Sequence, residues 1–156
     1  MSPTDVRLAA IQSEVARDWR EVRRQLARAE SVDPARSGPE AAFVALAIDH
    51  AYQALEQILL ALERALRLPE RSGERWHRAL LGDAALSLPG IRPPLFPAEA
   101  ERDWEDLLGF RHFLRHAYAV DLDPMRLGRN VERLRRAVEL TEPSMTLLLD
   151  SLAIRP

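Results

Sequence analysis

The sequence predicts an all-α fold, an up-and-down bundle of four long helices and one short helix, formed by residues 1–156 as a single domain. Apolar residues recur at the spacing of amphipathic helices over long segments, and no segment alternates with the period of two that strands show. Turns rich in proline, glycine or serine separate the helical segments. A length of 156 residues fits one domain around one core.

The first predicted helix covers residues 3–30. Ser2 suits the N-cap position, Pro3 the first helical position and Asp5 the first turn. The segment 31–38, which holds serine, proline and glycine, follows the helix. Between these signals, apolar residues recur at Val6, Ala9, Ala10, Val15, Trp19, Val22 and Leu26.

The second predicted helix, residues 39–68, is the central one. It opens with Pro39 and Glu40 and is apolar on almost every side, as expected of a helix surrounded by others. Its few polar positions between residues 41 and 66 are Asp49, His50, Gln53, Glu56, Gln57, Glu63 and Arg64.

A short amphipathic helix is predicted over residues 74–86, after a Ser-Gly turn. It carries Trp76, Leu80 and Leu81 on one side. The run 88–97 contains four prolines and one glycine, so we expect a rigid linker there.

Two further helices complete the bundle. One begins at Pro97 and extends to about Val120. The last begins with Asp123 as N-cap and Pro124 at the first helical position. Pro143 lacks a backbone N–H and its ring clashes with the preceding turn, so we expect it to break or kink this helix near residue 141.

Composition excludes several classes of function. The chain has no cysteine, which rules out disulfide frameworks and thiolate metal sites and suits a reducing cytoplasm. The formal net charge of −2 means that any nucleic-acid binding must be local. The N-terminus lacks a secretory pattern and no apolar run is long enough to span a membrane, so we expect a cytoplasmic protein.

Arg111 lies within an apolar stripe of the fourth long segment. At 100° per residue, its direction falls within roughly 60° of those of Trp104, Leu107, Leu108, Leu114 and Tyr118. A guanidinium in such a stripe needs a partner carboxylate, a cleft or another subunit, because burying it alone is costly. One structural interpretation is an ion pair with Asp49 or Glu56 of the central helix.

His116 points about 140° away from Arg111 on the same ideal helix. His112 lies about 40° from His116, and Arg115 falls between the two faces. For Arg111 and His116 to share one phosphate, either the helix loosens near residues 117–121 or two copies of the chain face each other across a dimer axis. This geometry favours a composite site.

The spacing of these residues is unusual for the composition. An Arg-x4-His pair is expected by chance about 0.6 times in this chain, but a tyrosine two residues later lowers that expectation below about 0.01. The triplet Arg111, His116 and Tyr118 is therefore more specific than the pair alone.

The triplet on a late helix of an all-α bundle resembles the HEPN superfamily and, within it, the HepT-like toxins. The segments 47–60, 72–81 and 110–118 are also similar to the corresponding parts of HepT-like proteins. This resemblance covers most of the chain and implies a HEPN-like bundle.

The resemblance implies a metal-independent endoribonuclease that acts as a homodimer, without a cofactor. Arg111 would hold the scissile phosphate, and His116 would act as general base or acid while the ribose 2′-hydroxyl attacks. His112 and Arg115 would help to bind the RNA substrate. A neighbouring MntA-like nucleotidyltransferase antitoxin would silence the toxin by adding AMP to Tyr118.

Other polar residues allow weaker interpretations. Trp76 and His77 are candidates for substrate contact or, for the tryptophan, for the core. His50 and Tyr52 of the central helix are either buried polar groups or neighbours of the motif helix. A set of arginines at the start of the last helix forms either a solvated face or a track for an RNA backbone. These arginines are Arg126, Arg129, Arg133, Arg135 and Arg136, against a single Glu132.

Two alternatives to the ribonuclease stay open. One is a catalytically inactive HEPN-like module that binds a partner protein, which the small net charge favours. The other is a metal- or ligand-binding bundle, which requires paired Glu-x-x-His motifs. The sequence has one such motif, Glu74 to His77, so this alternative ranks last.

Overall fold

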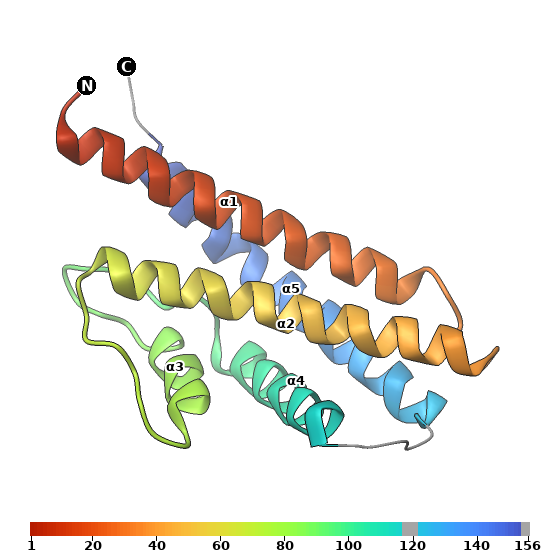
Figure 1. Ribbon diagram of the computed structural model, residues 1–156. Helices are drawn as coiled ribbons and strands as arrows, with labels where there is room; N and C mark the ends of the chain where they lie inside the picture. Colours follow the sequence, from red (N-terminus) through yellow and green to blue (C-terminus); the bar gives the residue numbers. More distant parts are fainter. Residues whose placement is uncertain (117–121, 154–156) are drawn as a thin grey trace.

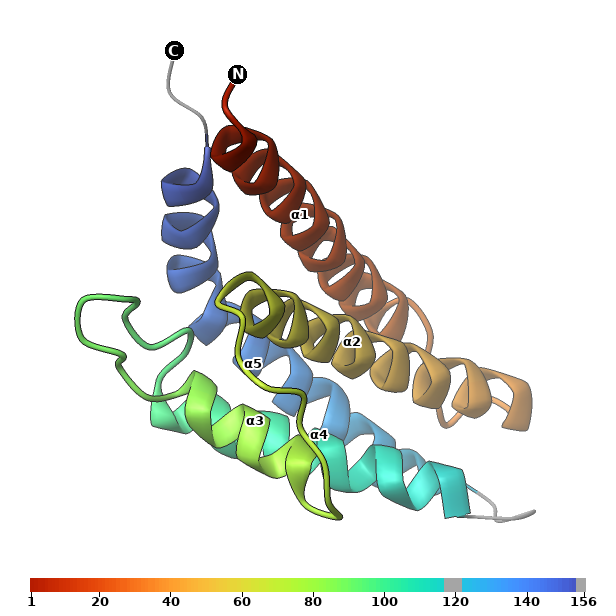
Figure 2. The same cartoon turned by 60° about the vertical axis from the view of Figure 1, so that its left-hand side comes forward.

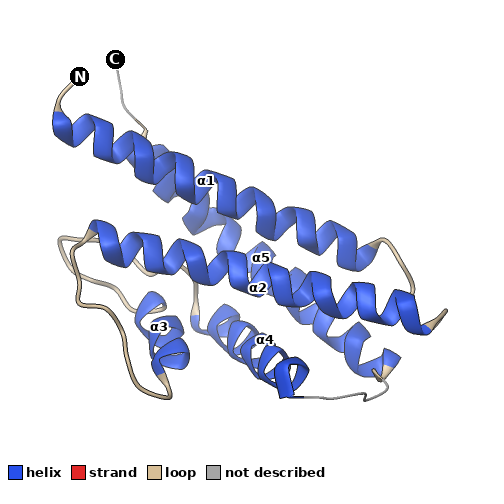
Figure 3. Ribbon diagram, viewed as in Figure 1, coloured by secondary structure: helices blue, strands red, loops and turns tan. Residues whose placement is uncertain are grey.

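The structure is a computed structural model that describes residues 1–116 and 122–153. Its described part consists of helices joined by loops and contains no strand (Figure 3), which confirms the all-α prediction. The helices are α1 (Pro3–Glu30), α2 (Gly38–Ala65), α3 (Trp76–Ala84), α4 (Ala98–His116) and α5 (Pro124–Leu152).

The four long helices run up and down. In Figure 1, α1 and α4 descend toward one end of the molecule and α2 and α5 return toward the other, where both chain termini lie. Helix α2 packs against α1, α4 and α5, and α1 also packs against α5. The short α3 lies against α2 and α4, outside the bundle of long helices (Figure 2).

The core confirms the central position of α2. Half of its residues are buried, more than in any other helix of the described chain, because it has neighbours on several sides. The largest fully buried side chains come from α2, α3, α4, α5 and the linker before α4. They are Trp104, Tyr52, Phe96, Ile48, Leu55, Ile58, Leu59, Leu80, Leu81, Leu107, Leu127 and Leu134.

Local chemistry sets the start of the first two helices. Ser2 caps α1 in a reciprocal capping box with Asp5, as the sequence suggested. Helix α2 begins at Gly38 because the hydroxyl of Ser37 accepts a hydrogen bond from the Glu40 amide at 3.2 Å. The predicted start at Pro39 was therefore one residue late.

Helix α2 ends at Ala65, earlier than the predicted residue 68. Arg67 adopts a left-handed backbone conformation with φ of 56°, and its amide donates to the carbonyl of Arg64 at 3.0 Å. The Leu68 amide donates to the carbonyl of Glu63 at 3.0 Å, which completes a Schellman motif. Glycine usually occupies this left-handed position after a helix, so the arginine at position 67 did not mark the helix end in the sequence.

The sequence predicted that Pro143 would break or kink the last helix, and the structure shows a kink within a continuous α5. The helix continues to Leu152, and its axis changes direction in the C-terminal half (Figure 2). The Thr141 hydroxyl donates to the carbonyl of Ala137 at 2.7 Å, a bond that itself tends to bend helices. Buried residues lie on both sides of Pro143, Val138 before it and Met145 after it, so the core packs against the helix across the bend.

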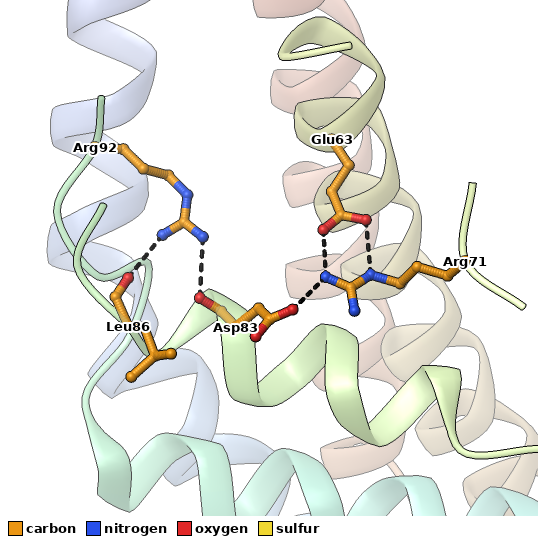
Figure 4. Close-up of polar contacts among 5 residues, drawn as sticks. All are labelled: Glu63, Arg71, Asp83, Leu86 and Arg92. Carbon is orange, nitrogen blue, oxygen red and sulfur yellow. Dashed lines mark hydrogen bonds and ion pairs between the residues drawn. The ribbon is translucent and has the colours of Figure 1, made fainter. Parts of the chain in front are cut away.

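Two arginines tie α3 to the rest of the fold (Figure 4). Arg71 forms a two-pronged ion pair with Glu63 of α2, at 2.8 and 2.6 Å, and also contacts the carboxylate of Asp83 on α3. Arg92 donates to the backbone carbonyls of Asp83 and Leu86 at 3.0 and 3.1 Å. These contacts fix α3 beside α2, although it is shorter than the predicted 74–86.

The predicted rigid linker contains a tight turn. The Ile91 amide donates to the carbonyl of Leu88 at 2.9 Å, with Pro89 and Gly90 between them. Gly90 has φ of 77°, so this turn needs a residue that tolerates a positive φ. The linker therefore sets the direction in which the chain enters α4.

Candidate functional site

Arg111 on α4 pairs with Asp49 on α2. Nη1 of Arg111 and Oδ1 of Asp49 lie 3.5 Å apart, and only 14% and 16% of the two side chains are exposed. The other oxygen of Asp49 accepts a hydrogen bond from the amide of Gln53 at 2.8 Å. Of the two carboxylates suggested by the sequence, Asp49 is the partner and Glu56 is not.

Up to residue 116, the apolar stripe around Arg111 is present as predicted. Trp104 and Leu107 are fully buried, and Leu108 and Leu114 are partly buried against the core. Phe110, next to Arg111 in the chain, is also buried, a contribution that the stripe did not include. The stripe holds α4 against α2 and α5, and Arg111 within it lies within reach of Asp49.

His112 and His116 lie on the exposed side of α4. Their ring centroids are 4.4 Å apart, as expected for residues four apart on one helix. Arg115 is exposed as well. The described part of α4 thus places His116 on its exposed side, away from the contact between Arg111 and Asp49, in agreement with the ideal-helix geometry. Tyr118 lies outside the described residues.

A buried polar contact that the sequence did not indicate lies along α2. The hydroxyl of Tyr52, fully buried, donates to Oε2 of Glu56 at 2.9 Å. The same oxygen lies 2.7 Å from Nδ1 of His77 on α3. Burial, together with the Glu56 carboxylate, raises the pKa of Tyr52, so the hydroxyl keeps its proton.

Asp49, Tyr52, Gln53 and Glu56 form a row on one face of α2, which we call the α2 polar row. The spacing of three, four and seven residues places them on that face. The row contacts Arg111 of α4 through Asp49 and His77 of α3 through Glu56. The sequence analysis did not identify this row, although its helical spacing could have indicated it. The partner of Glu56 depends on the position of α3.

Of the remaining aromatic and histidine candidates, Trp76 and His77 form a stacked pair and His50 lies at the surface. Trp76 is partly buried and stacks on His77, with ring centroids 3.6 Å apart, so it both packs on the core and fixes the histidine ring. His50 is exposed on α2 and is therefore not a buried histidine.

The arginine run on α5 pairs mainly with neighbouring helices. Arg136 forms a two-pronged ion pair with Asp103 of α4, and Arg135 contacts Glu30 of α1 and Glu132. These contacts use the guanidinium groups to join helices. Arg133 contacts Asp106 and Asn130, and Arg126 lies over the rings of Phe110 and Phe113. Arg129 is exposed and forms no ion pair among the described residues.

The described residues hold neither a cluster of metal-binding side chains nor a helix that could span a membrane. Across 1–116 and 122–153, no three or more histidine, aspartate or glutamate side chains gather as a metal site. No helix in this part of the chain has the length and apolar character needed to cross a membrane.

Comparison with known families identifies the family of this chain. The family model described as HepT-like protein matches residues 43–152, which is more than half of the chain and extends from the first turns of α2 to the end of α5. The matched region contains Arg111, Asp49 and the α2 polar row. No curated protein and no solved structure showed a significant match. The chain belongs to the HepT-like family of the HEPN superfamily.

Proposed function

We propose that this chain is a metal-independent endoribonuclease toxin that works as a homodimer. Arg111 binds the scissile phosphate and stabilises its developing negative charge. His116 accepts the proton of the ribose 2′-hydroxyl while the oxygen attacks phosphorus. The bond to the 5′-oxygen then breaks, and a second proton-transfer group, the His116 of the other copy, protonates the leaving oxygen.

The proposal is supported best by the surroundings of Arg111, which is largely buried but has few polar contacts within the described part of the chain. The chain also belongs to the HepT-like family. The guanidinium of Arg111 is largely buried on an apolar helix face but makes a single long contact of 3.5 Å with Asp49 among the described residues. Charge-assisted hydrogen bonds are usually shorter, and a guanidinium has further N–H donors. Arg111 therefore keeps donor capacity for a phosphate oxygen.

The site is proposed to be shared between two copies, because His116 does not point to the same side of α4 as Arg111. Exposed His112 and His116 stand beside each other, where a second copy could supply the missing groups. His112 and Arg115 are proposed to bind the RNA on this exposed side.

The proposed silencing step is the transfer of AMP from ATP to the Tyr118 hydroxyl by an MntA-like nucleotidyltransferase, with release of pyrophosphate. A phosphate attached there would compete for Arg111 and repel the RNA backbone. Incubating the chain with that enzyme and ATP should add the mass of AMP to the native chain and not to Tyr118→Phe. Modification of the Phe variant to the same extent would contradict this assignment.

The test of the nuclease is cleavage of a defined RNA in the presence of EDTA. Arg111→Ala and His116→Ala should each lower the cleavage rate by roughly 100-fold or more, because each removes a group that acts in the transition state. His50→Ala, which changes an exposed histidine on α2, is the matched control and should cleave normally. Full activity in both motif variants would overturn the proposal.

A catalytically inactive HEPN-like module is the second candidate, and the Asp49 contact is the observation that favours it. An arginine satisfied by a carboxylate on the neighbouring helix can be purely structural. This candidate predicts a stable complex with the product of the adjacent gene and no cleavage of RNA at any protein concentration. Light scattering would measure dimerisation in parallel.

A further inference from the structure

A groove lies between the start of α3 and the exposed side of α4. It has a volume of about 470 Å³ and lies beside the helix that carries the proposed catalytic residues. Its lining comes from the start of α3 and from the middle of α4, and includes Glu74, Arg75, His77, Arg78, Gly109 and His112. Gly109 leaves open space on the α4 wall, since a Cβ there would meet no other atom within 4 Å.

The groove carries more positive than negative groups. Arg75 and Arg78 are exposed, and within the described residues neither takes part in an ion pair. Glu74 is the one carboxylate of the lining, against these two guanidinium groups and two histidines. The groove therefore suits a ligand with repeated negative charges, although the whole chain has a net charge of −2.

His77 is fixed in the groove by contacts on two sides. Trp76 stacks on its ring, and Nδ1 lies 2.7 Å from Oε2 of the buried Glu56. That oxygen already accepts the Tyr52 hydroxyl, so it acts as an acceptor, and we assign the proton to Nδ1 of His77. No hydrogen bond within the described part of the chain involves Nε2, which is left for a ligand.

We propose that this α3–α4 groove binds phosphate groups of the RNA strand outside the scissile bond, with His77, positioned by Glu56, as its central phosphate-binding residue. When protonated, Nε2 donates to a phosphate oxygen, and Arg75 and Arg78 supply neighbouring positive charge. This inference rests on the proposed ribonuclease function and adds a second region of substrate contact to it.

The α2 polar row connects the two regions. Asp49 and Glu56 are seven residues apart, a rise of about 10 Å along the helix. At one end the row holds Arg111, and at the other it holds His77. His112, which the sequence assigned to substrate binding, lines the groove directly. One short RNA strand can therefore reach from the cleavage motif into the groove.

The test measures binding of the full-length chain to a fluorescent 2′-O-methyl RNA oligonucleotide. This probe lacks the nucleophile, so its affinity does not depend on catalysis. The His77→Asn variant keeps a donor toward Glu56 but removes the atom that faces the groove. Arg78→Gln removes one charge of the lining, whereas Arg20→Gln, on a helix that contacts neither α3 nor α4, removes one charge elsewhere.

We expect His77→Asn and Arg78→Gln each to weaken binding roughly five- to tenfold, the effect of losing one charge-assisted contact. The slope of log affinity against log salt should fall by about 0.7 for Arg78→Gln. Arg20→Gln should bind normally, and thermal unfolding should show that His77→Asn remains folded. A single-stranded DNA of the same sequence should lose affinity to the same extent, because the contact is with phosphate.

Native affinity in both groove variants, or an equal loss in Arg20→Gln, would overturn the proposal. The binding test and the cleavage test can fail independently of each other. Weaker probe binding by the groove variants of a chain that never cleaves RNA supports the groove and rejects the ribonuclease. With cleavable RNA, the expected effect of His77→Asn is a higher KM at unchanged kcat, while a fall in kcat with native probe affinity contradicts a phosphate-binding role.

Discussion

Arg111 of α4 and Asp49 of α2 face each other across a helix interface, with Nη1 and Oδ1 separated by 3.5 Å. The distance is longer than that of a strong charge-assisted hydrogen bond. Asp49 is itself held by the Gln53 amide at 2.8 Å, so the carboxylate is fixed while the guanidinium keeps some freedom. This arrangement positions Arg111 without using all of its donors.

Asp49→Asn is therefore expected to affect cleavage more than stability. The amide keeps a hydrogen bond with Gln53 but no longer attracts Arg111. We expect a loss in cleavage rate of roughly tenfold, and a decrease of about 1 kcal/mol in the free energy of unfolding, because the contact that is lost is long and therefore weak, at 3.5 Å. Cleavage assays and urea unfolding measure the two effects. Asp150→Asn, an exposed carboxylate on α5, is the control, and equal cleavage by both variants would argue against a positioning role.

The ion pair between Arg136 of α5 and Asp103 of α4 should contribute to stability. Nε and Nη2 of Arg136 contact the two oxygens of Asp103 at 2.7 and 2.6 Å, and 6% of the Asp103 side chain is exposed. Arg136→Ala leaves this carboxylate without its partner. We expect a loss of about 2 kcal/mol, less than for a pair buried on both sides because Arg136 is largely exposed.

Chemical denaturation of Arg136→Ala measures this effect, with Arg129→Ala as the matched control. Arg129 is an exposed arginine of the same helix and has no ion pair among the described residues. The double variant Asp103→Ala with Arg136→Ala should recover part of the lost stability, since no unpaired charge remains. Equal stability of the Arg136 and Arg129 variants would show that the pair contributes nothing.

The helix starts were predictable from sequence because they depend on neighbouring residues. Ser2 and Asp5 form a capping box within one turn, and Asp123 caps α5 through the Met125 amide at 3.0 Å. Helix α2 ended earlier than predicted because Arg67 adopts a left-handed backbone conformation, which is uncommon for residues other than glycine. Pro143 stayed within a helix because packing along α5 offsets its local cost.

The candidate site was predictable in part. The position of Arg111 in an apolar stripe indicated a partner carboxylate, a cleft or another subunit, and Asp49 was one of the two carboxylates of the central helix that the sequence offered. The contact between Glu56 and His77 joins residues 21 apart in the chain. It depends on how α3 docks, which the Arg71 bridge between α2 and α3 determines. Such a contact follows from tertiary arrangement and has no periodic signal in the sequence.

The hydroxyl of Thr141 links α4 to the bent part of α5. The indole N–H of the fully buried Trp104 donates to this hydroxyl at 3.2 Å, and the hydroxyl donates to the Ala137 carbonyl at 2.7 Å. Thr141→Val keeps the shape but leaves the indole N–H buried without a partner. We expect a loss of about 1–3 kcal/mol in the free energy of unfolding.

A double-mutant cycle with Trp104→Phe tests this explanation. Phenylalanine has no N–H, so in its background Thr141→Val should cost less than in the native chain. Urea unfolding of the four proteins gives the coupling energy. Equal costs in the two backgrounds would mean that the tryptophan contact does not stabilise the fold.

Tyr52 should make stability depend on pH in alkaline solution. Burial and the adjacent Glu56 carboxylate raise the pKa of Tyr52 above its ordinary value of 10.0, opposed in part by Arg111. A raised pKa in the folded state means that the stabilising contribution is complete below pH 10.0 and is lost as pH rises above that value. The free energy of unfolding should therefore decline there, and less steeply in Tyr52→Phe.

The chain has two tyrosines, so the Tyr118→Phe variant reports on Tyr52 alone. Ultraviolet absorbance of tyrosinate should stay low in this variant as pH passes 10.0 and rise only when circular dichroism shows loss of helix. Ionisation near the ordinary pKa with the helices intact would mean that Tyr52 is accessible to water. Glu56 would then no longer accept a hydrogen bond from a protonated Tyr52, and the assignment of the proton to Nδ1 of His77 would lose its support.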